Sequence, residues 1–186
     1  MLAWCSLALI LLSLSVPALC ARQIRTIDDT TGDSVIPGNV PIYSPSASWN
    51  IQPGCNGCRL QPNNMSMVFN RSWHDGTHSV QDGPKSVQFS FTGVALSVFC
   101  ILPPKNIDEI IGQPGTIINY NLAFTLDGRS VGPPFVRTQD QLTNEWQYNV
   151  SVITLDGLEN REHTFVMEMA STKTDSVTLF DYASYV

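Results

Sequence analysis

Short segments of alternating or continuous apolar residues recur along most of the sequence, and this recurrence constrains the fold more than any other feature. In residues 86–91 every second side chain is apolar, which is the period of a half-buried β-strand. Comparable segments return about every 10 to 15 residues between turn signals, and no convincing amphipathic helix appears among them. The pattern predicts an all-β fold, an antiparallel β-sandwich of the jelly-roll type.

The expected strands and turns form one continuous series. We predict strands over residues 86–91, 94–102, 117–126, 129–131, 147–153, 163–169 and 177–185. Thr92-Gly93 is predicted to turn between the first two strands, Asp127-Gly128 to form a tight hairpin, and residues 154–160 to form a turn-rich link. Residues 32–64 are rich in Pro, Ser, Asn and Gly, and we interpret them as a loop-rich cover held by Trp49 and a disulfide, not as a second domain.

Size and charge exclude a nucleic-acid-binding domain. The 186 residues carry 10 Lys and Arg against 16 Asp and Glu, which gives a net charge of −6. A nucleic-acid partner requires a basic face, and this acidic chain offers no excess of positive charge. With 43% hydrophobic residues, the chain can build a buried core, and its length fits one domain.

The N-terminus has the pattern of a secretory signal peptide. Residues 2–21 contain no charged side chain, and a leucine-rich core at residues 7–14 is ended by Pro17. We therefore expect cleavage near residue 21, which leaves residues 22–186 as a single secreted domain. The alternative is an uncleaved signal anchor, because about 20 apolar residues can span a bilayer. No other segment approaches that length, so we expect no transmembrane segment after signal removal.

Cysteines and glycosylation sequons agree with a secretory route. Three of the five cysteines lie after the predicted signal, at Cys55, Cys58 and Cys100. Cys20 joins them if cleavage precedes it. An oxidising compartment favours a disulfide, but the sequence leaves all three pairings of these cysteines open. N-glycosylation sequons begin at Asn64, Asn70 and Asn149.

Four segments carry motifs that belong together. They read FNRSWHDGT at residues 69–77, VQFSFTGVALSVFCIL at 87–102, FTLDG at 124–128, and LDGL, HT and LFDY between 155 and 182. In combination they resemble the galactose-binding-domain-like jelly rolls of secreted and membrane-anchored proteins of basidiomycete fungi. The resemblance implies a jelly-roll fold and an extracellular compartment. It implies no particular site residue, because the activities of such domains are mostly unassigned.

Two patterns suggest metal binding. Cys55, Cys58, His74 and His78 follow a zinc-finger spacing. The intervening residues show no helical period, and secretion favours a disulfide over free thiolates, so we expect no zinc. The acidic run at residues 28–33 offers oxygen ligands for calcium but lacks EF-hand spacing, and we interpret it as a solvated turn.

Gly128-Arg-Ser130-Val-Gly132 matches the G-x-S-x-G pattern of a nucleophile elbow, and Asp140, Asp156 and His163 follow in the order of a hydrolase triad. The elbow requires a helix directly after the serine, and Pro133-Pro134 prevents one. We therefore predict no catalytic residue. His163 is expected to begin a strand and bond a loop carbonyl group.

Aromatic and polar side chains offer a candidate sugar site. In Trp73-His74-Asp75, the tryptophan ring would stack on a sugar and the polar groups would bond its hydroxyls. In the alternative interpretation, Trp73 packs in the core and Asp75 caps a Gly76-Thr77 turn. The candidate ligand-binding residues are Trp73, His74, Asp75, Trp49, Trp146 and Tyr148.

The leading hypothesis is a secreted, non-catalytic module without a cofactor that binds a glycan, a cell-wall component or another extracellular partner. The first alternative is a structural or interaction ectodomain related to membrane-anchored fungal receptors. The second is a carbohydrate-active hydrolase, since a pair of carboxylates at glycosidase distance cannot be recognised from sequence.

Overall fold

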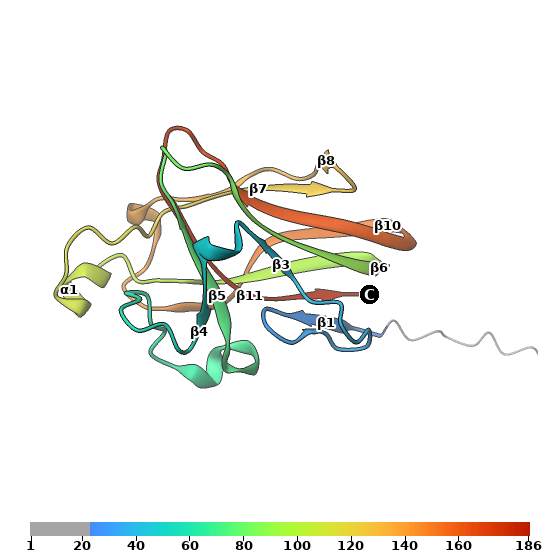
Figure 1. The fold of residues 1–186 in the computed structure, drawn as a ribbon, viewed down its shortest axis with the longest axis horizontal. Helices are drawn as coiled ribbons and strands as arrows, with labels where there is room; N and C mark the ends of the chain where they lie inside the picture. The colour runs from blue at the N-terminus through green and yellow to red at the C-terminus, as the bar shows by residue number, and fades with distance from the viewer. Residues whose placement is uncertain (1–22) are drawn as a thin grey trace, which may run out of the picture.

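The computed structural model describes residues 23–186, so the predicted signal peptide and Cys20 lie outside the described part (Figure 1). Within it the chain forms eleven β-strands and one short α-helix. All strand pairs are antiparallel. The predicted all-β, antiparallel fold is therefore confirmed. Among residues 23–186 no helix is long and apolar enough to cross a bilayer.

Most strands belong to one continuous path of hydrogen-bonded neighbours. Its order is β2 (Gly32–Asp33), β1 (Arg25–Asp28), β11 (Ser176–Tyr185), β6 (Lys85–Leu102), β10 (Gln147–Met169), β7 (Tyr120–Leu126) and β8 (Arg129–Ser130). The remaining strands branch from it: β3 (Ile42–Ser44) on β6, β5 (Trp73–His78) on β11, β4 (Trp49–Gln52) on β5, and β9 (Phe135–Arg137) on β7. The branching strands and the loops between them cover the central path.

The two longest strands, β6 and β10, fold the sheet back on itself. Phe180 of β11 pairs with Cys100 near the end of β6, yet its ring centroid lies 6.1 Å from that of Phe89 in the first half of β6. A straight strand would separate Phe89 and Cys100 by about 36 Å. The two halves of β6 therefore belong to opposite layers of a sandwich, and aromatic side chains such as Phe89 and Phe165 fill the core between the layers.

Two predicted turns are wrong, because each lies inside a long strand. β6 runs through Thr92-Gly93 without interruption. Glycine is required there for a different reason, since a Cβ on Gly93 would lie 2.3 Å from the carbonyl oxygen of Val186. β10 likewise continues through residues 154–160 and absorbs the extra residues as a shift in register between Asp156 and Arg161.

The Asp127-Gly128 hairpin is confirmed. It joins β7 to β8, with Leu126 opposite Arg129. The φ angles of Asp127 and Gly128 are 51° and 75°, and two successive positive values are those of a type I′ turn, whose twist matches paired strands.

Residues 32–64 contain more regular structure than the predicted loop-rich cover, because β3 and β4 lie in this segment. Trp49 of β4 is buried and packs over Gly76, where a Cβ would lie only 3.0 Å from the indole ring. The turn expected at Gly76-Thr77 is therefore wrong, since both residues belong to β5.

One short helix escaped the sequence analysis. α1 covers Ile107–Ile111, follows Asn106, and ends at Gly112 in the left-handed conformation with φ of 68°. Asparagine before a helix and glycine after it are ordinary start and stop signals. Five residues are too few to show an amphipathic period, so the helix could be recognised only from its ends.

Candidate functional site

Two hollows lie next to each other and share part of their lining, and α1 lines one of them. Figure 1 shows α1 at one end of the molecule. The first, which we call the polar hollow, has a volume of about 330 Å³ and is lined by Asn50, Leu60, Asp75, Thr77, Gly115, Thr116 and Ile117. The second, which we call the Trp146 hollow, has a volume of about 340 Å³ and is lined by Gln61, Asn63, Ile107, Ile110, Ile111, Gln113 and Trp146. Gly57, Cys58 and Arg59 line both hollows and form the ridge between them.

A disulfide closes the ridge. Cys55 is bonded to Cys58, which settles the pairing that the sequence left open. Cys100 is a free thiol within residues 23–186 and is completely buried, and burial raises its pKa. Because Cys55 and Cys58 are joined, they are not available as thiolates for the zinc-finger spacing.

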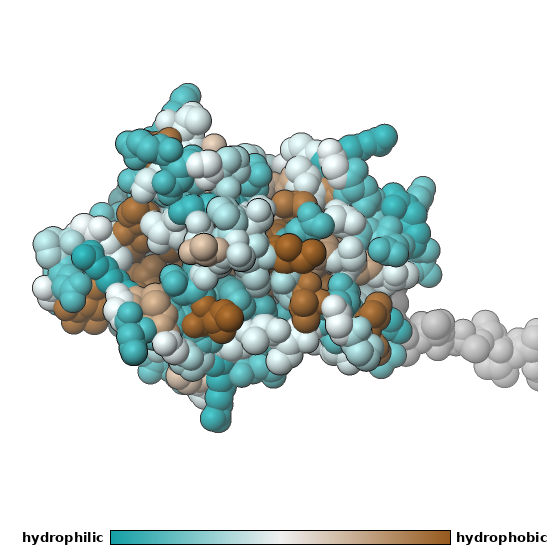
Figure 2. Space-filling view, viewed as in Figure 1, coloured by the Kyte–Doolittle hydropathy of each residue, from teal (hydrophilic) through white to brown (hydrophobic). Residues whose placement is uncertain are grey.

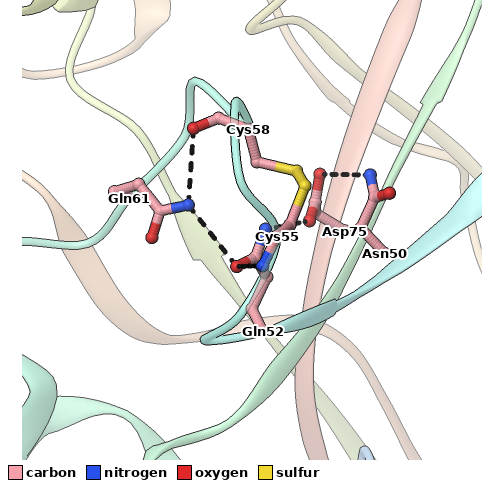
Figure 3. The surroundings of a disulfide bond; sticks show 6 residues. All are labelled: Asn50, Gln52, Cys55, Cys58, Gln61 and Asp75. Carbon is pink, nitrogen blue, oxygen red and sulfur yellow. Dashed lines mark hydrogen bonds between the residues drawn. A yellow bond between two sulfur atoms is a disulfide. The ribbon is translucent and has the colours of Figure 1, made fainter.

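The side chain of Gln52 connects the ridge to the polar hollow (Figure 3). This side chain is buried, and its amide nitrogen donates to Asp75 Oδ1 at 3.0 Å. Its oxygen accepts from the backbone nitrogen of Cys55 and from Gln61 Nε2, both at 3.4 Å. In Figure 3, Gln61 lies on one side of the disulfide and Asp75 on the other. One buried amide therefore fixes the position of the ridge relative to polar groups of both hollows.

Asp75 keeps unused hydrogen-bonding capacity in the polar hollow. The pairing of β4 with β5 places Asn50 opposite Asp75, and Asn50 Nδ2 donates to Asp75 Oδ2 at 3.4 Å. Burial raises the pKa of Asp75, and the hydrogen bonds from Gln52 and Asn50 oppose this shift. A carboxylate has about four acceptor positions, so two protein donors leave room for donors of a ligand.

The Trp146 hollow combines an apolar wall with side-chain amides. Trp146 is half-buried and packs against the core, and the isoleucines of α1 supply the facing wall. Ile110 exposes 58% of its surface, and Figure 2 shows hydrophobic surface over α1 at this end of the molecule. Gln61, Asn63 and Gln113 contribute amide groups. An apolar wall with a few polar groups is the usual composition of a small-ligand site.

Tyr148 supports this hollow from outside its lining. Its hydroxyl group donates to Asn63 Oδ1 at 3.0 Å and accepts from the backbone nitrogen of Asn64 at 2.9 Å. The tyrosine therefore orients Asn63, which lines the hollow, rather than presenting its own ring there.

The group Trp73-His74-Asp75 is divided by the alternation of β5, which sends neighbouring side chains to opposite faces. Trp73 is 0% exposed, so its ring has no face free for a sugar and it packs in the core. His74 is buried, stacks on Tyr43 at 3.9 Å between ring centroids, and contacts Asp29. Trp49 is also buried. Of the six candidate residues, Asp75 lines the polar hollow and Trp146 lines the Trp146 hollow, whereas the other four line neither of these two hollows.

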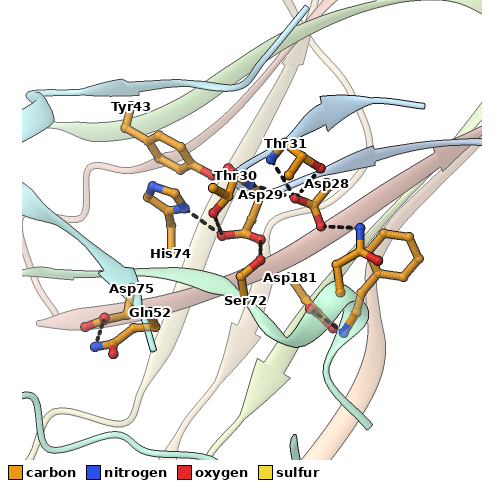
Figure 4. A network of polar contacts seen from close by, with 12 residues as sticks. Asp28, Asp29, Thr30, Thr31, Tyr43, Gln52, Ser72, His74, Asp75 and Asp181 are labelled. Atoms are coloured by element: carbon orange, nitrogen blue, oxygen red, sulfur yellow. Dashed lines mark hydrogen bonds and ion pairs between the residues drawn. The ribbon is translucent and has the colours of Figure 1, made fainter. Parts of the chain in front are cut away.

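The acidic run at residues 28–33 is not the solvated turn that we expected, because Asp28, Asp29 and Asp33 are buried. Figure 4 shows the polar contacts around Asp28 and Asp29. The oxygens of Asp29 contact His74 Nδ1 at 2.7 Å and accept from the hydroxyls of Ser72 and Thr30. Asp28 accepts hydrogen bonds from Thr30, Thr31 and Asn70. Asp33 accepts from the backbone nitrogens of Val35 and Ile36 and from the side chains of Asn39 and Tyr185. No cluster suited to a metal ion occurs among residues 23–186.

Asp181 completes this buried region, and we call Asp28, Asp29 and Asp181 the aspartate network. Asp181 is 0% exposed, and its Oδ1 accepts from the backbone nitrogen of Phe69 at 3.0 Å. Its Oδ2 has no hydrogen-bond partner in the described part of the chain. Burial, followed by the charges of Asp29 and Asp28, raises the pKa of Asp181 to about 8. A protonated carboxyl group avoids an uncompensated charge at this position.

The hydrolase pattern around Ser130 is not a catalytic triad. His163 Nδ1 lies 2.9 Å from Asp127 Oδ2, and His163 Nε2 lies 2.8 Å from the carbonyl oxygen of Glu159. Both ring nitrogens are therefore engaged away from Ser130, which is exposed in β8. His163 does not begin a strand as expected, because it lies inside β10, and the carbonyl group that it contacts belongs to Glu159 of the same strand and not to a loop.

The three sequon asparagines lie on the surface. Asn64 and Asn149 are exposed, as is Asn70, but Asn70 Nδ2 also donates to the buried Asp28 at 3.0 Å. Glycosylation at these residues remains a prediction.

No protein-family model matches the chain, and no curated protein sequence matches it significantly. A native family 35 carbohydrate-binding module from Clostridium thermocellum aligns over 88% of this chain and 97% of its own, with 9% identity and a TM-score of 0.46. The module TmCBM61, solved with β-1,4-galactotriose, aligns over 78% and 87%, with 13% identity and a TM-score of 0.37. The catalytic unit of a GH87 α-1,3-glucanase from Streptomyces thermodiastaticus aligns over 78% and 25%, with 12% identity and a TM-score of 0.31. Similarity this distant carries no functional argument.

Proposed function

We propose that this protein is a non-catalytic carbohydrate-binding module and that the Trp146 hollow is its binding site. The observation that carries the proposal is the joint lining of one hollow by Trp146, the isoleucines of α1 and the amides of Gln61, Asn63 and Gln113. A sugar ring has an apolar face and an edge of hydroxyl groups. The indole ring and isoleucines match the face, and the amides match the edge as donors and acceptors.

The proposal includes an extracellular setting. A secretory leader at residues 1–21, a single domain over residues 22–186, and N-glycosylation at Asn64, Asn70 and Asn149 form one consistent set, and the Cys55–Cys58 disulfide is compatible with it. We propose a cell-wall or other extracellular glycan as the partner, in a basidiomycete fungus as the sequence motifs imply. The alternative of an interaction ectodomain related to membrane-anchored receptors predicts a protein partner instead.

The lining of the hollows argues against hydrolysis. A glycosidase usually requires two carboxyl groups flanking the scissile bond. Asp75 is the only carboxylate among the residues that line the polar hollow, and none lines the Trp146 hollow. We therefore expect no release of reducing ends from a polysaccharide that binds in these two hollows.

The test is binding to insoluble and soluble wall polysaccharides by the purified protein, compared among the wild type, Trp146→Ala and Trp146→Phe. We expect Trp146→Ala to lose at least tenfold in affinity and Trp146→Phe to retain part of it, because phenylalanine keeps an aromatic face. Val136→Ala removes an exposed apolar side chain that lines neither hollow and serves as the control. Thermal unfolding of each variant checks that the fold is intact. Absence of binding to every polysaccharide, in an assay that detects millimolar affinity, would overturn the proposal.

A further inference from the structure

The two hollows are adjacent and chemically different. They meet at the ridge of Gly57, Cys58 and Arg59, and each has a volume near the lower end of the range for small-ligand sites. The Trp146 hollow offers an aromatic wall. The polar hollow has no aromatic side chain in its lining, but it contains Asp75 with unused acceptor positions.

From this arrangement we infer that the polar hollow is a second sugar subsite, and that the protein binds a neutral oligosaccharide that crosses the disulfide ridge. The inference rests on the proposed function. One sugar unit stacks in the Trp146 hollow, and a following unit donates its hydroxyl groups to Asp75 in the polar hollow. The exposed side chains of Asn50 and Thr77 lie at the same hollow and contact the same unit.

The ridge is suited to support a chain that passes over it. Its backbone is closed by the Cys55–Cys58 bond and is tied to both sides by the Gln52 side chain. Arg59 has a further contact, because its guanidinium group donates to the carbonyl oxygen of Pro114 at 3.1 Å. A fixed ridge lets both subsites be occupied without the cost of ordering a loop.

Charge selects a neutral ligand. An acidic sugar in the polar hollow would place its carboxylate beside Asp75. A cationic amino sugar would be attracted by Asp75 but repelled by Arg59, which lines the same hollow, so it gains no clear advantage over a neutral sugar. The net charge of −6 adds repulsion toward polyanionic glycans. Neutral sugars satisfy both hollows through hydroxyl groups alone.

The test is calorimetry with neutral oligosaccharides of one to six units from β-1,3-glucan, β-1,4-glucan and β-1,4-mannan. For a sugar series that binds, we expect affinity to rise at least tenfold from the monosaccharide to the trisaccharide or tetrasaccharide and then to level off. Oligogalacturonate is the acidic comparison and should bind at least tenfold more weakly, and chitosan oligosaccharides are the cationic comparison and should bind no more tightly than the neutral series. Tighter binding of either charged series would overturn the neutral assignment.

Variants separate the second subsite from the first. Asn50→Ala and Thr77→Val change exposed side chains of the polar hollow and should lower tetrasaccharide affinity threefold to tenfold while leaving monosaccharide affinity unchanged. Trp146→Ala should weaken both. Equal affinity for the monosaccharide and the tetrasaccharide, or no effect of Asn50→Ala and Thr77→Val on the tetrasaccharide, would overturn the second subsite while leaving the proposed function intact. Absence of binding by the wild type to every sugar would overturn both.

Discussion

The aspartate network and the polar hollow both bury carboxyl groups, but they use them in opposite ways. In the network, Asp28 and Asp29 are surrounded by donors of the protein itself, including Ser72, His74 and Asn70. In the polar hollow, Asp75 has two amide donors and an open space in front of it. The comparison teaches that burial alone does not mark a binding site. Unused hydrogen-bonding capacity that faces a hollow is the feature on which we base the proposal that Asp75 contacts a ligand.

Asp75 and Asp181 show the same difference between a carboxyl group that lines a hollow and one that is enclosed by the protein. Burial raises the pKa of both groups. Asp181 has one donor and is closed off from solvent, so its proton serves the fold. Asp75 is accessible to a ligand, so its ionisation is expected to influence binding. Four changes test this division between a structural region and a binding region.

The largest effect is expected from Asp29→Ala. The substitution leaves His74, Ser72 and Thr30 without their shared acceptor in a buried region. We expect the free energy of unfolding to fall by about 3 kcal/mol, because the buried His74 and the half-buried Ser72 lose their acceptor and the exposed Thr30 loses a hydrogen bond. Urea denaturation measures the loss, and the fraction that stays folded should keep the oligosaccharide affinity of the wild type. A loss below about 1 kcal/mol would show that these contacts are not structural.

Removal of the disulfide by the double variant Cys55→Ser, Cys58→Ser should lower both the stability of the fold and the affinity for oligosaccharides, but to different extents. The closed loop is short, so the chain-entropy model gives a loss of about 2 kcal/mol in stability. We expect the larger consequence in binding, with a loss of tetrasaccharide affinity that exceeds the loss for the monosaccharide. Cys100→Ser, which changes a buried cysteine outside the disulfide, is the control for altering a sulfur atom in this protein. An unchanged ratio of tetrasaccharide affinity to monosaccharide affinity would show that the disulfide does not support binding at the second subsite.

Asp181→Asn should change the pH dependence of stability. The pKa of Asp181 is about 8 in the folded protein and lower when the chain unfolds, so the folded state holds an extra proton between the two values. The stability of the wild type is therefore highest at acidic pH with respect to this group and falls as the pH rises to about 8. The variant lacks this decline, and we expect it to be more stable than the wild type by about 1 to 2 kcal/mol at alkaline pH. Parallel pH profiles from urea denaturation would contradict the assignment.

The smallest effect is expected from acidification at Asp75. Because burial raises the pKa of Asp75 above its ordinary value of 3.8, its carboxylate takes up a proton before most exposed carboxyl groups do. Tetrasaccharide affinity should then decrease a few-fold as the pH falls through the pKa of Asp75, since the protonated carboxyl group accepts fewer hydrogen bonds. Monosaccharide affinity in the Trp146 hollow should remain constant. Calorimetry at several pH values measures both, and a parallel decrease of the two would argue against a role for Asp75.

Much of the fold could be predicted from local patterns. Alternation predicted strands at residues 86–91 and 117–126, and the Asp127-Gly128 turn has a conformation that this dipeptide strongly favours. Gly93 misled the prediction because glycine has two uses. The sequence shows that a side chain is absent, but only the folded structure shows whether a turn or a close approach requires it.

The site was less predictable, because it is assembled by contacts between distant segments. Asp75 and Trp146 were recognisable as residue types that bind sugars. Gln52 was not, because nothing in its neighbourhood in sequence indicates that its amide will reach Asp75, 23 residues away. The pairing of β4 with β5 creates that contact, and the sequence patterns predicted neither strand.

The pairing of the first strand with the last has a practical consequence. β1 lies beside β11, with Arg25 opposite Tyr185, so the two ends of the described chain are neighbours. Figure 1 shows the C-terminus at the end of the molecule opposite α1. A protein immobilised through a C-terminal tag therefore presents both hollows away from the support. Sensor surfaces prepared in this way can offer the site to insoluble polysaccharide particles that a randomly coupled protein would exclude.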